Sequence, residues 1–463
     1  MARRKKVASA LSPEEKLQQA LVPTEEQPYP IPKNWCWTYI GNCYEVTSSK
    51  RVHKEDWKDS GVPFYRTREL VKLSENGYVD NELFIANELY EKLVADYGKP
   101  KIGDVLISGV GTIGVPFIVK ENTPFYFKDG NVIWFQCKGI CLPEYIFYLY
   151  KSNFMNNLIH DMSAGTTMDT YTIVNANRTV FPLPPLAEQK RIVDRIESLF
   201  AKLDEAKEKA RAVVDGFELR KSAILHKAFT GELSEQWRKE HGMGLDSWKN
   251  RTLNSVCSSI FDGDHMPPPK SENGIPFLVI SNVNNGHLSY ENTRFVSQKY
   301  YDSLSETRKP QMGDVLYTLV GSYGIPVVVD DERPFCFQRH MALLKPSEIN
   351  TYFLWYLLQS KEIFNKVSEI ATGTAQLTVP IKGLRMLTFQ KPTADEQVKI
   401  VQIIDSILGK EQKAKQAAED VLNQIDKIKK AILARAFRGE LGTNDPTEEW
   451  VGELVKKLLS EEV

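Results

Sequence analysis

Two long stretches of the chain carry apolar or small residues at an alternating spacing of four and three positions. This spacing averages 3.5 residues per turn, which is typical of the seam of a coiled coil. Each stretch follows proline-rich sequence, continues for some 42 residues without proline and meets a glycine, so each predicts one long helix. Arg220 interrupts the first seam and Glu411 the second. The seam positions are Ile192, Ile196, Leu199, Leu203, Ala206, Ala210, Val213, Phe217 and Ile224, and then Ile400, Ile404, Ile407, Ala414, Ala418, Val421, Ile425, Ile428 and Ile432.

The two stretches are copies of each other. The segment that begins AEQKRIV at Ala187 recurs as DEQVKIV at Asp395 without a gap, at an offset of 208 residues. A weaker repeat precedes each copy, where GDVLISGVGTIG at Gly103 matches GDVLYTLVGSYG at Gly313. The layout is therefore variable domain, helix, variable domain, helix.

The variable domains mix short aromatic and β-branched runs with glycine and asparagine turns and helical stretches. We therefore predict an α+β fold: two globular domains, two long antiparallel coiled-coil helices and a pseudo-two-fold internal repeat. The predicted segments are an N-terminal arm (1–33), the first domain (34–185), a central helix (186–233), the second domain (234–389), a distal helix (390–441) and a C-terminal tail helix (442–463).

A helix about 60 Å long with one apolar stripe needs a partner along its length. The simplest partner is the other copy, and antiparallel pairing would relate the two domains by a pseudo-two-fold axis. The alternative is that each helix packs on its own domain.

The loops of both domains carry side chains suited to DNA. Arginine, asparagine and glutamine can read base edges, while lysine, serine and threonine hold phosphates. For any single residue a solvated surface group is the simpler interpretation, so the hypothesis rests on the two domains together. If both bind DNA, their different sequences predict an asymmetric, bipartite target. The candidates are Lys50, Arg51, His53, Lys54, Arg66, Arg68, Lys128, Asn131, Thr166, Thr167, His265, Lys270, Asn282, Asn284, Gln338, Arg339, His340, Thr374 and Gln376.

The composition of the chain indicates which classes of protein it can belong to. The 463 residues are 42% hydrophobic and 26% charged, and no apolar run approaches the roughly 18 residues of a membrane span. The N-terminal region lacks a signal-like apolar core, so we expect a cytoplasmic protein. Six cysteines without a C-x-x-C pair predict reduced, mostly buried thiols and no zinc. The net charge of −1 requires that basic groups gather on one face or that a partner supplies phosphate contacts.

Two motifs resemble enzyme sites. GVGTIG, from Gly109 to Gly114, matches a dinucleotide fingerprint, but its second copy reads LVGSYG and a strand-like run follows where a helix is required, so we predict a turn. FDGDH holds Asp262, Asp264 and His265, and we favour an Asp-Gly turn presenting the histidine over a metal site. Nucleophile-elbow, Walker and H-E-x-x-H patterns are absent, which indicates a chain without an active site.

Over nearly its whole length the chain resembles the specificity subunits of Type I restriction-modification systems. PLPPLAEQKRIV at Pro182, KAFTGEL with ARAFRGEL, and the repeated GDVL pattern carry the resemblance. It implies two target-recognition domains and helices that dock two methyltransferase subunits, with restriction/translocase subunits joining them. S-adenosylmethionine is expected on the methyltransferase, with no cofactor, metal or membrane contact for this chain. The resemblance and the apolar seam together assign a set of residues to the helix scaffold. They are Glu188, Gln189, Ile192, Ile196, Leu199, Leu203, Glu396, Gln397, Ile400, Ile404 and Ile407.

Two other functions stay open at this point. A coiled-coil scaffold could bridge protein partners without DNA contact, and it would be indifferent to duplex sequence. An oxidoreductase built around Gly109 to Gly114 would bind a nucleotide cofactor as an isolated chain.

Overall fold

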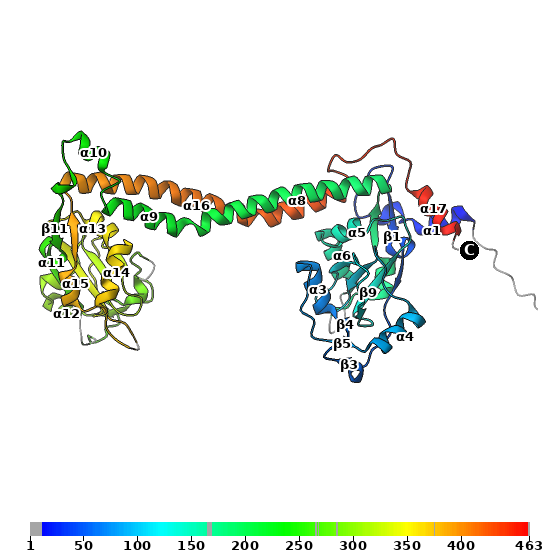
Figure 1. Ribbon diagram of the computed structural model, residues 1–463, viewed down its shortest axis with the longest axis horizontal. Coiled ribbons are helices and arrows are strands. Elements are labelled where there is room, and N and C mark those ends of the chain that lie inside the picture. Colours follow the sequence, from blue (N-terminus) through cyan, green and yellow to red (C-terminus); the bar gives the residue numbers. More distant parts are fainter. Residues whose placement is uncertain are drawn as a thin grey trace, which may run out of the picture. The chain divides into compact units, whose positions relative to one another are not determined.

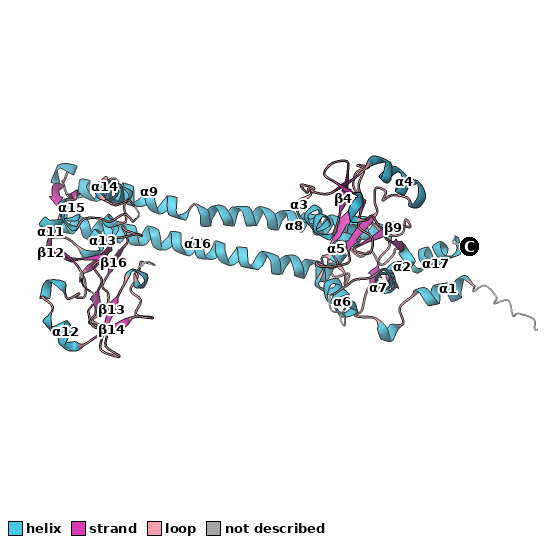
Figure 2. Ribbon diagram, turned by 90° about the horizontal axis from the view of Figure 1, so that it is seen from below, coloured by secondary structure: helices cyan, strands magenta, loops and turns pink. Residues whose placement is uncertain are grey.

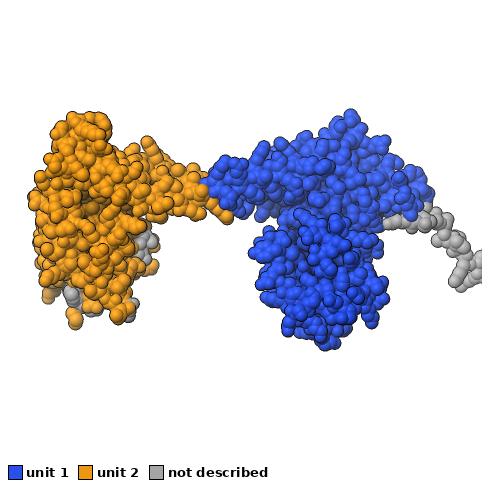
Figure 3. Space-filling model, viewed as in Figure 1, with its two compact units in different colours: residues 1–209, 421–463 blue, residues 210–420 orange. Residues whose placement is uncertain are grey.

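The computed structural model describes residues 12–163, 169–263, 266, 268–283, 286–374 and 376–461. The chain forms two compact units. Unit 1 consists of residues 1–209 and 421–463, and unit 2 consists of residues 210–420 (Figure 3). Strands and helices are mixed within each unit (Figure 2), so the α+β prediction is confirmed.

The first described element of unit 1 is helix α1 (Pro13–Ala20), whose N-cap is Ser12. Its first domain then follows the alternating pattern of short apolar runs. The elements are β1 (Cys36–Tyr39), α2 (Ile40–Cys43), β2 (Tyr44–Thr47), β3 (Trp57–Lys58), β4 (Val62–Tyr65), α3 (Thr67–Asn76), β5 (Phe84–Ile85), α4 (Asn87–Tyr97), β6 (Val105–Ser108), β7 (Pro116–Ile118), β8 (Tyr126–Phe127), β9 (Val132–Cys137), α5 (Pro143–Tyr150), α6 (Asn153–Ser163), α7 (Ile173–Arg178) and β10 (Val180–Leu183).

Unit 2 repeats this order without counterparts of β3 and α3. Its elements are α10 (Glu235–Glu240), β11 (Lys249–Thr252), α11 (Leu253–Val256), β12 (Cys257–Asp262), β13 (Ile275–Leu278), β14 (Arg294–Val296), α12 (Gln298–Ser303), β15 (Val315–Thr318), β16 (Pro326–Val328), β17 (Cys336–Phe337), β18 (Met341–Pro346), α13 (Thr351–Leu358), α14 (Lys361–Ile370), α15 (Ile381–Met386) and β19 (Thr388–Lys391).

The two domains share their sheet topology except for β3, which pairs with β5 in unit 1 and has no counterpart in the three-stranded sheet of unit 2. The central antiparallel sheet has the order β2-β9-β6-β7 in unit 1 and β12-β18-β15-β16 in unit 2. A second sheet places β4 antiparallel to β5 and parallel to β8, and likewise β13 antiparallel to β14 and parallel to β17. A two-stranded ladder joins the first and last strands of each domain, β1 with β10 and β11 with β19. The sequence repeat is therefore also a repeat of strand pairing.

The long helices are α8 (Leu186–Asp215), α9 (Phe217–Phe229) and α16 (Ala394–Ala436) (Figure 1). The prediction of one continuous helix holds for the second copy and is wrong for the first, which is interrupted at Gly216. Helix α17 (Gly452–Glu461) follows as a separate helix near the end of the chain.

In each unit the two copies run antiparallel. In unit 1 Asp204 on α8 accepts a 2.6 Å hydrogen bond from Lys429 on α16. The buried Ile192 and Ile196 at the start of α8 share one apolar core with Phe437, just past the end of α16. In unit 2 Leu225 near the end of α9 shares a core with residues at the start of α16, Ile400 and Ile404.

The ends of the helices also belong to the domain cores. In unit 1 the ring of Phe437 packs edge-on against Tyr145 of α5, with ring centroids 5.4 Å apart. In unit 2 Phe229 meets Phe353 of α13 in the same way, also at 5.4 Å. Each seam therefore buries its outer turns against a domain, and its inner turns are buried only in part. Ala210, Ala418 and Ile425 are buried, whereas the predicted seam positions Ala414, Val421 and Ile428 are exposed, the last two by 43% and 41%.

Candidate nucleic-acid interface

Four segments of the first domain meet at one end of its central sheet. We call residues 48–54, 66–68, 109–112 and 128–131 the first loop face. Ser48 donates a 2.7 Å hydrogen bond to the carbonyl of Val132 and accepts one from the amide of Gly130. The carbonyl of Asn131 accepts from the amide of Gly109 at 2.7 Å and from the Thr67 hydroxyl at 3.2 Å. Segments far apart in the sequence are thus joined by one backbone hydrogen bond and by the hydroxyls of Ser48 and Thr67, which bond to backbone groups.

Several predicted DNA contacts lie on this face. Lys50, His53 and Lys54 are exposed. Arg51 is 72% exposed and its Nε lies 3.2 Å from a carboxylate oxygen of Asp129, which leaves most of the guanidinium open to solvent. Lys128 and Asn131 are half-buried.

Arg66 and Arg68 are already engaged within the domain. Both donate to the buried carboxylate of Glu69, at 2.8 Å from Arg66 Nη2 and 3.0 Å from Arg68 Nε. Burial alone would raise the pKa of Glu69, but hydrogen bonds from Arg66 and Arg68 outweigh it and bring this pKa to about 2. Arg68 also pairs with Glu82 at 2.6 Å. The two arginines therefore order the start of α3, and their charges are neutralised locally.

The second domain builds a similar face, in which the segments after β12, after β15 and before β18 correspond to those after β2, after β6 and before β9. We call residues 262–263, 319–322, 338–340 and 374–379, with position 375 outside the described residues, the second loop face. Leu319 donates its amide to the carbonyl of His340 at 2.8 Å, and Gly321 donates to that of Leu377 at 3.1 Å. An isolated bridge joins Val320 to Thr378. In unit 1 the same kind of bridge joins Val110 to Thr170.

Three predicted DNA contacts gather around one cavity of this face. Arg339, His340 and Gln376 line a space of about 360 Å³ together with Asp262 and Thr378. Burial and the neighbouring charge of Arg339 lower the pKa of His340, so its imidazole stays neutral near pH 7. A cation, an amide and a neutral imidazole side by side can donate to and accept from a base edge.

The other candidates of the second domain are distributed differently. Lys270 and Thr374 are exposed and Gln338 is half-buried. Asn282 is only 5% exposed, and its amide group accepts from the backbone of Val279 and donates to the carbonyl of Glu291. This internal use favours a structural role for Asn282. Thr166, Thr167, His265 and Asn284 lie outside the described residues.

The structure places the GVGTIG motif in a turn between two strands and describes only part of the FDGDH motif. Gly109 to Gly114 connects β6 to β7, with positive φ at Gly111 and Gly114, and a strand follows it. The prediction of a turn is confirmed, because a dinucleotide fingerprint needs a helix there. Asp264 and His265 are outside the described residues, and only Asp262 of that cluster can be placed. Within the described part of the chain no three His, Cys, Asp or Glu side chains form a group that could hold a metal ion.

Five of the six cysteines are buried, as expected, and Cys137 is exposed. In the described ranges no helix has the length and apolar character to cross a membrane.

Glu188 and Glu396 are buried carboxylates at equivalent positions at the start of the two long helices. Glu188 accepts hydrogen bonds from Arg191 at 2.7 Å and from Thr443 at 2.8 Å. Arg191 also forms a two-pronged pair with Glu448, both contacts being 2.9 Å. This ties the start of α8 to the segment that follows α16 within unit 1.

In unit 2 the same device holds the start of α16 to the segment after α9. Glu396 accepts from Ser234 at 2.7 Å, from Arg238 at 2.6 Å and from the indole of Trp248 at 2.9 Å. The Arg238 side chain is only 7% exposed, so this pair is more deeply buried than that of Arg191 and Glu188. We call these two arrangements the carboxylate clamps.

The glutamines next to the clamps attach the helices to the domains. Gln189 accepts from the amide of Leu142 at 2.7 Å, and Gln397 accepts from that of Asn350 at 2.9 Å. Ile192, Ile196, Ile400 and Ile404 are fully buried, whereas Leu199, Leu203 and Ile407 are half-buried.

Sequence reasoning missed the clamp partners Arg191, Ser234, Arg238, Trp248, Thr443 and Glu448. Arg191 carried a local signal, since it follows Glu188 by three positions, which places both on one helix face. The others lie far from the carboxylates in sequence and have no such signal.

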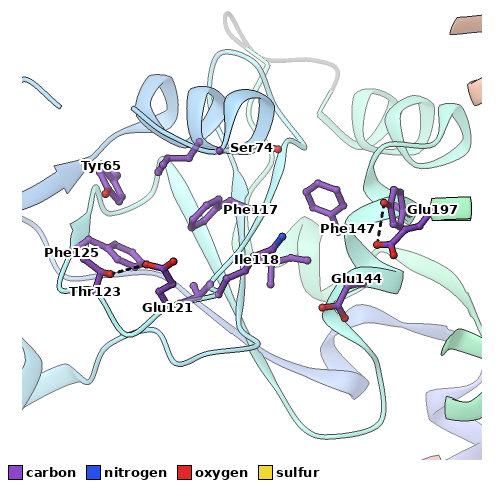
Figure 4. A pocket seen from close by; sticks show the side chains of 15 residues that line it. Tyr65, Ser74, Phe117, Ile118, Glu121, Thr123, Phe125, Glu144, Phe147 and Glu197 are labelled. Atoms are coloured by element: carbon purple, nitrogen blue, oxygen red, sulfur yellow. Dashed lines mark hydrogen bonds between the residues drawn. The ribbon is translucent and has the colours of Figure 1, made fainter. Parts of the chain in front are cut away.

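A separate cavity in unit 1, of about 450 Å³, has a different character (Figure 4). Tyr65, Phe117, Phe125 and Phe147 supply its apolar walls. Glu121, Glu144 and Glu197 lie among its lining residues, and Glu197 accepts a hydrogen bond from Tyr148 at 3.4 Å. Three carboxylates and the single cation Lys120 line this cavity, so its charge is less suited to phosphate contact than that of the loop faces.

Known proteins resemble the chain throughout. The family model of the Type I restriction modification DNA specificity domain matches twice, over residues 32–213 and 246–421. The specificity subunit of the EcoKI restriction enzyme of Escherichia coli is 24% identical over 447 residues, which are 91% of each chain. That of the EcoBI enzyme, also from Escherichia coli, is 25% identical over 89% of this chain and 85% of its own length.

Two solved structures share the fold. The crystal structure of the HsdS subunit from Thermoanaerobacter tengcongensis aligns with 90% of this chain and 100% of its own, with a TM-score of 0.65 and 21% identity. A chain from a structural study of complex assembly and conformational transition in a type I restriction-modification system aligns with a TM-score of 0.62 and 21% identity, over 89% of this chain and 100% of its own.

Proposed function

Because the chain belongs to the Type I restriction-modification DNA specificity family, we propose that it reads an asymmetric, bipartite DNA site, with one domain for each half. The observation that carries this proposal is the pair of loop faces. The two faces share three equivalent segments of the repeated domain, but the side chains differ. Arg51 and Lys50 stand on the first face, whereas Arg339, His340 and Gln376 stand on the second. Because the two faces present different side chains on the same domain fold, we expect them to read two different half-sites.

The chain does no chemistry in this proposal. Methyltransferase subunits dock on the long helices, two in each complex, and restriction/translocase subunits join the assembly. S-adenosylmethionine binds to the methyltransferase subunits, and this chain supplies the sequence recognition. The assembly acts on chromosomal and incoming DNA in the cytoplasm.

The role of the helices follows from their attachments. The carboxylate clamps and the Gln189 and Gln397 hydrogen bonds join each helix start to its domain and to the end of the other copy. Because each helix is attached to a domain in this way, a methyltransferase subunit that docks on a helix would be held close to the half-site that this domain reads.

Methylome sequencing tests the proposal directly. Cells that lack the chain should lose one adenine-methylation motif with two specified halves and an unspecified spacer. Replacing residues 245–389 with the corresponding domain of a relative that has another specificity should then change one half of that motif. A change in both halves, or in neither, would contradict the assignment of one domain to each half.

A purified complex gives an independent measurement. Affinity for a duplex that carries the motif should fall steeply with salt, because phosphate contacts release counterions. Arg339→Ala should weaken this binding and relax the preference at one base pair, and Lys239→Ala, which removes an exposed cation on α10, is the charge-matched control. Equal affinity for duplexes with and without the motif would favour a scaffold that bridges proteins.

A further inference from the structure

The two misfits of the coiled-coil seams are each other's partner. Arg220 and Glu411 are the charged residues that interrupt the apolar stripes, and in unit 2 Arg220 Nε lies 2.6 Å from a carboxylate oxygen of Glu411. Their side chains are 37% and 28% exposed, so the pair is partly withdrawn from water. Arg220 Nη2 also donates to the carbonyl of Val213 at 2.7 Å.

The interruption of the first copy at Gly216 accommodates this arginine. A Cβ atom at Gly216 would lie 2.4 Å from Arg220 Nη1, so the guanidinium occupies the space that any other residue would fill. The equivalent position of the second copy is Gln424, in the middle of the continuous helix α16. The glycine, the break and the arginine therefore form one local arrangement that the second copy lacks.

The repeat supplies an apolar counterpart to the charged pair. At the offset of 208 residues Arg220 corresponds to Ile428, and Glu411 corresponds to Leu203. Both counterparts are in unit 1, beside the Asp204–Lys429 ion pair that joins the two helices there. One turn of the helix pair is thus charged, and its repeat-related turn carries the half-buried Leu203 and Ile428, which is 41% exposed.

Because of this asymmetry, the charged residues face each other when a first-copy helix pairs with a second-copy helix, but not when two helices of the same copy pair. The two helices are similar enough that the first copy of one chain could pair with the first copy of a second chain, in the same antiparallel register. Arg220 would then face Leu203, and in a pair of second copies Glu411 would face Ile428. Each charge would lose its partner and meet an aliphatic side chain, which costs more than the matched pair does.

We propose that the Arg220–Glu411 pair selects intramolecular pairing of the two unlike helices and disfavours association with a second copy of this chain through its helices. A single polar position in a coiled coil is known to fix register and partner in this manner, at some cost in stability. The inference does not require DNA recognition. If the proposed function also holds, the pair keeps two different domains together, whereas like-with-like pairing would combine two identical domains.

The test removes the asymmetry without creating an unpaired charge. In the variant Arg220→Ile with Glu411→Leu, each charged residue is replaced by the one at its repeat-related position. Replacing a partly buried ion pair with aliphatic side chains is compatible with folding. The full-length variant and the unaltered chain are unfolded in denaturant, refolded over a wide range of protein concentration, and analysed by size exclusion with light scattering.

The unaltered chain should refold as a monomer at all these concentrations. The double variant should form dimers whose share rises with concentration and exceeds that of the unaltered chain by about tenfold or more, since several unpaired charges no longer oppose like-with-like pairing. A double variant that refolds to the same monomer content as the unaltered chain overturns the proposal.

Charge reversal provides the control for unspecific effects. Arg220→Glu alone places two carboxylates opposite each other and should increase dimer formation, whereas Arg220→Glu with Glu411→Arg should restore the monomer. If the double reversal forms as much dimer as the single one, the mutual pairing of these residues does not decide the partner, and the proposal fails.

Discussion

The carboxylate clamp of unit 2 gives the sharpest test of how the helices are held. Glu396 has no solvent exposure and accepts hydrogen bonds from Ser234, Arg238 and Trp248. The change Glu396→Gln keeps the shape of the side chain but removes its charge. It also turns one acceptor into an amide donor that faces other donors.

The expected loss follows from the burial of the partners. Removing one member of a buried ion pair costs about 3 to 5 kcal/mol, because the remaining charge is left in a poorly solvated place. Arg238 is 7% exposed and loses its carboxylate partner in this variant. The matched change Glu188→Gln in unit 1 should cost only about 1 to 2 kcal/mol. The reason is that Arg191 is 38% exposed and keeps the carboxylate of Glu448 at 2.9 Å.

Hydrogen exchange measures the two clamps separately. In Glu396→Gln the amide protection of residues 231–248 should fall by about a hundredfold, which corresponds to roughly 3 kcal/mol. In Glu188→Gln the weaker effect should appear in residues 439–450. Equal losses in both variants, or a loss of protection in the wrong segment, would show that burial of the arginine partner does not set the strength of the clamp.

Three further predictions concern other parts of the chain. The pKa of Glu69 is about 2 in the folded protein against an ordinary 4.5, so its ionised form stabilises the fold fully above pH 4.5 and loses this effect as the pH falls toward 2. Glu69→Gln should remove up to about 3 kcal/mol of that pH dependence in urea unfolding, and an unchanged pH profile would refute the assignment. Gly216→Ala should destabilise the chain by about 1 kcal/mol in thermal unfolding, because its Cβ would lie 2.4 Å from Arg220 Nη1 and 2.9 Å from the carbonyl oxygen of Ala212. Replacing Arg220 by isoleucine removes the first contact and keeps the second, so the cost should become smaller without vanishing; strictly additive effects would contradict the contact with Arg220. Under the proposed function, Arg339→Ala should cost about 1 to 3 kcal/mol of affinity for the correct duplex, measured by fluorescence anisotropy, and the affinity for unrelated duplexes should change little.

The sequence by itself determined the architecture of the repeat. Apolar periodicity marked both seams, and the gapless offset between the copies predicted two like domains and two like helices. Ile192, Ile196, Ile400 and Ile404 were identified as seam residues in this way, and all four are fully buried. Such patterns are readable because a helix repeats every few residues, so the positions that must be buried recur at a fixed local spacing.

Only the tertiary structure showed which groups the polar and charged residues outside these apolar patterns contact. Arg220 and Glu411 read as isolated misfits, 191 positions apart, until the antiparallel pairing brought them to 2.6 Å. The partners of Glu188 and Glu396 were equally hidden, because Thr443 and Trp248 approach from segments with no local relation to them. Among the polar loop residues, Arg339 and Gln376 line a common cavity, whereas Asn282 is used internally. A charged or polar side chain finds its partner through contacts between distant segments, and no local period in the sequence records those contacts.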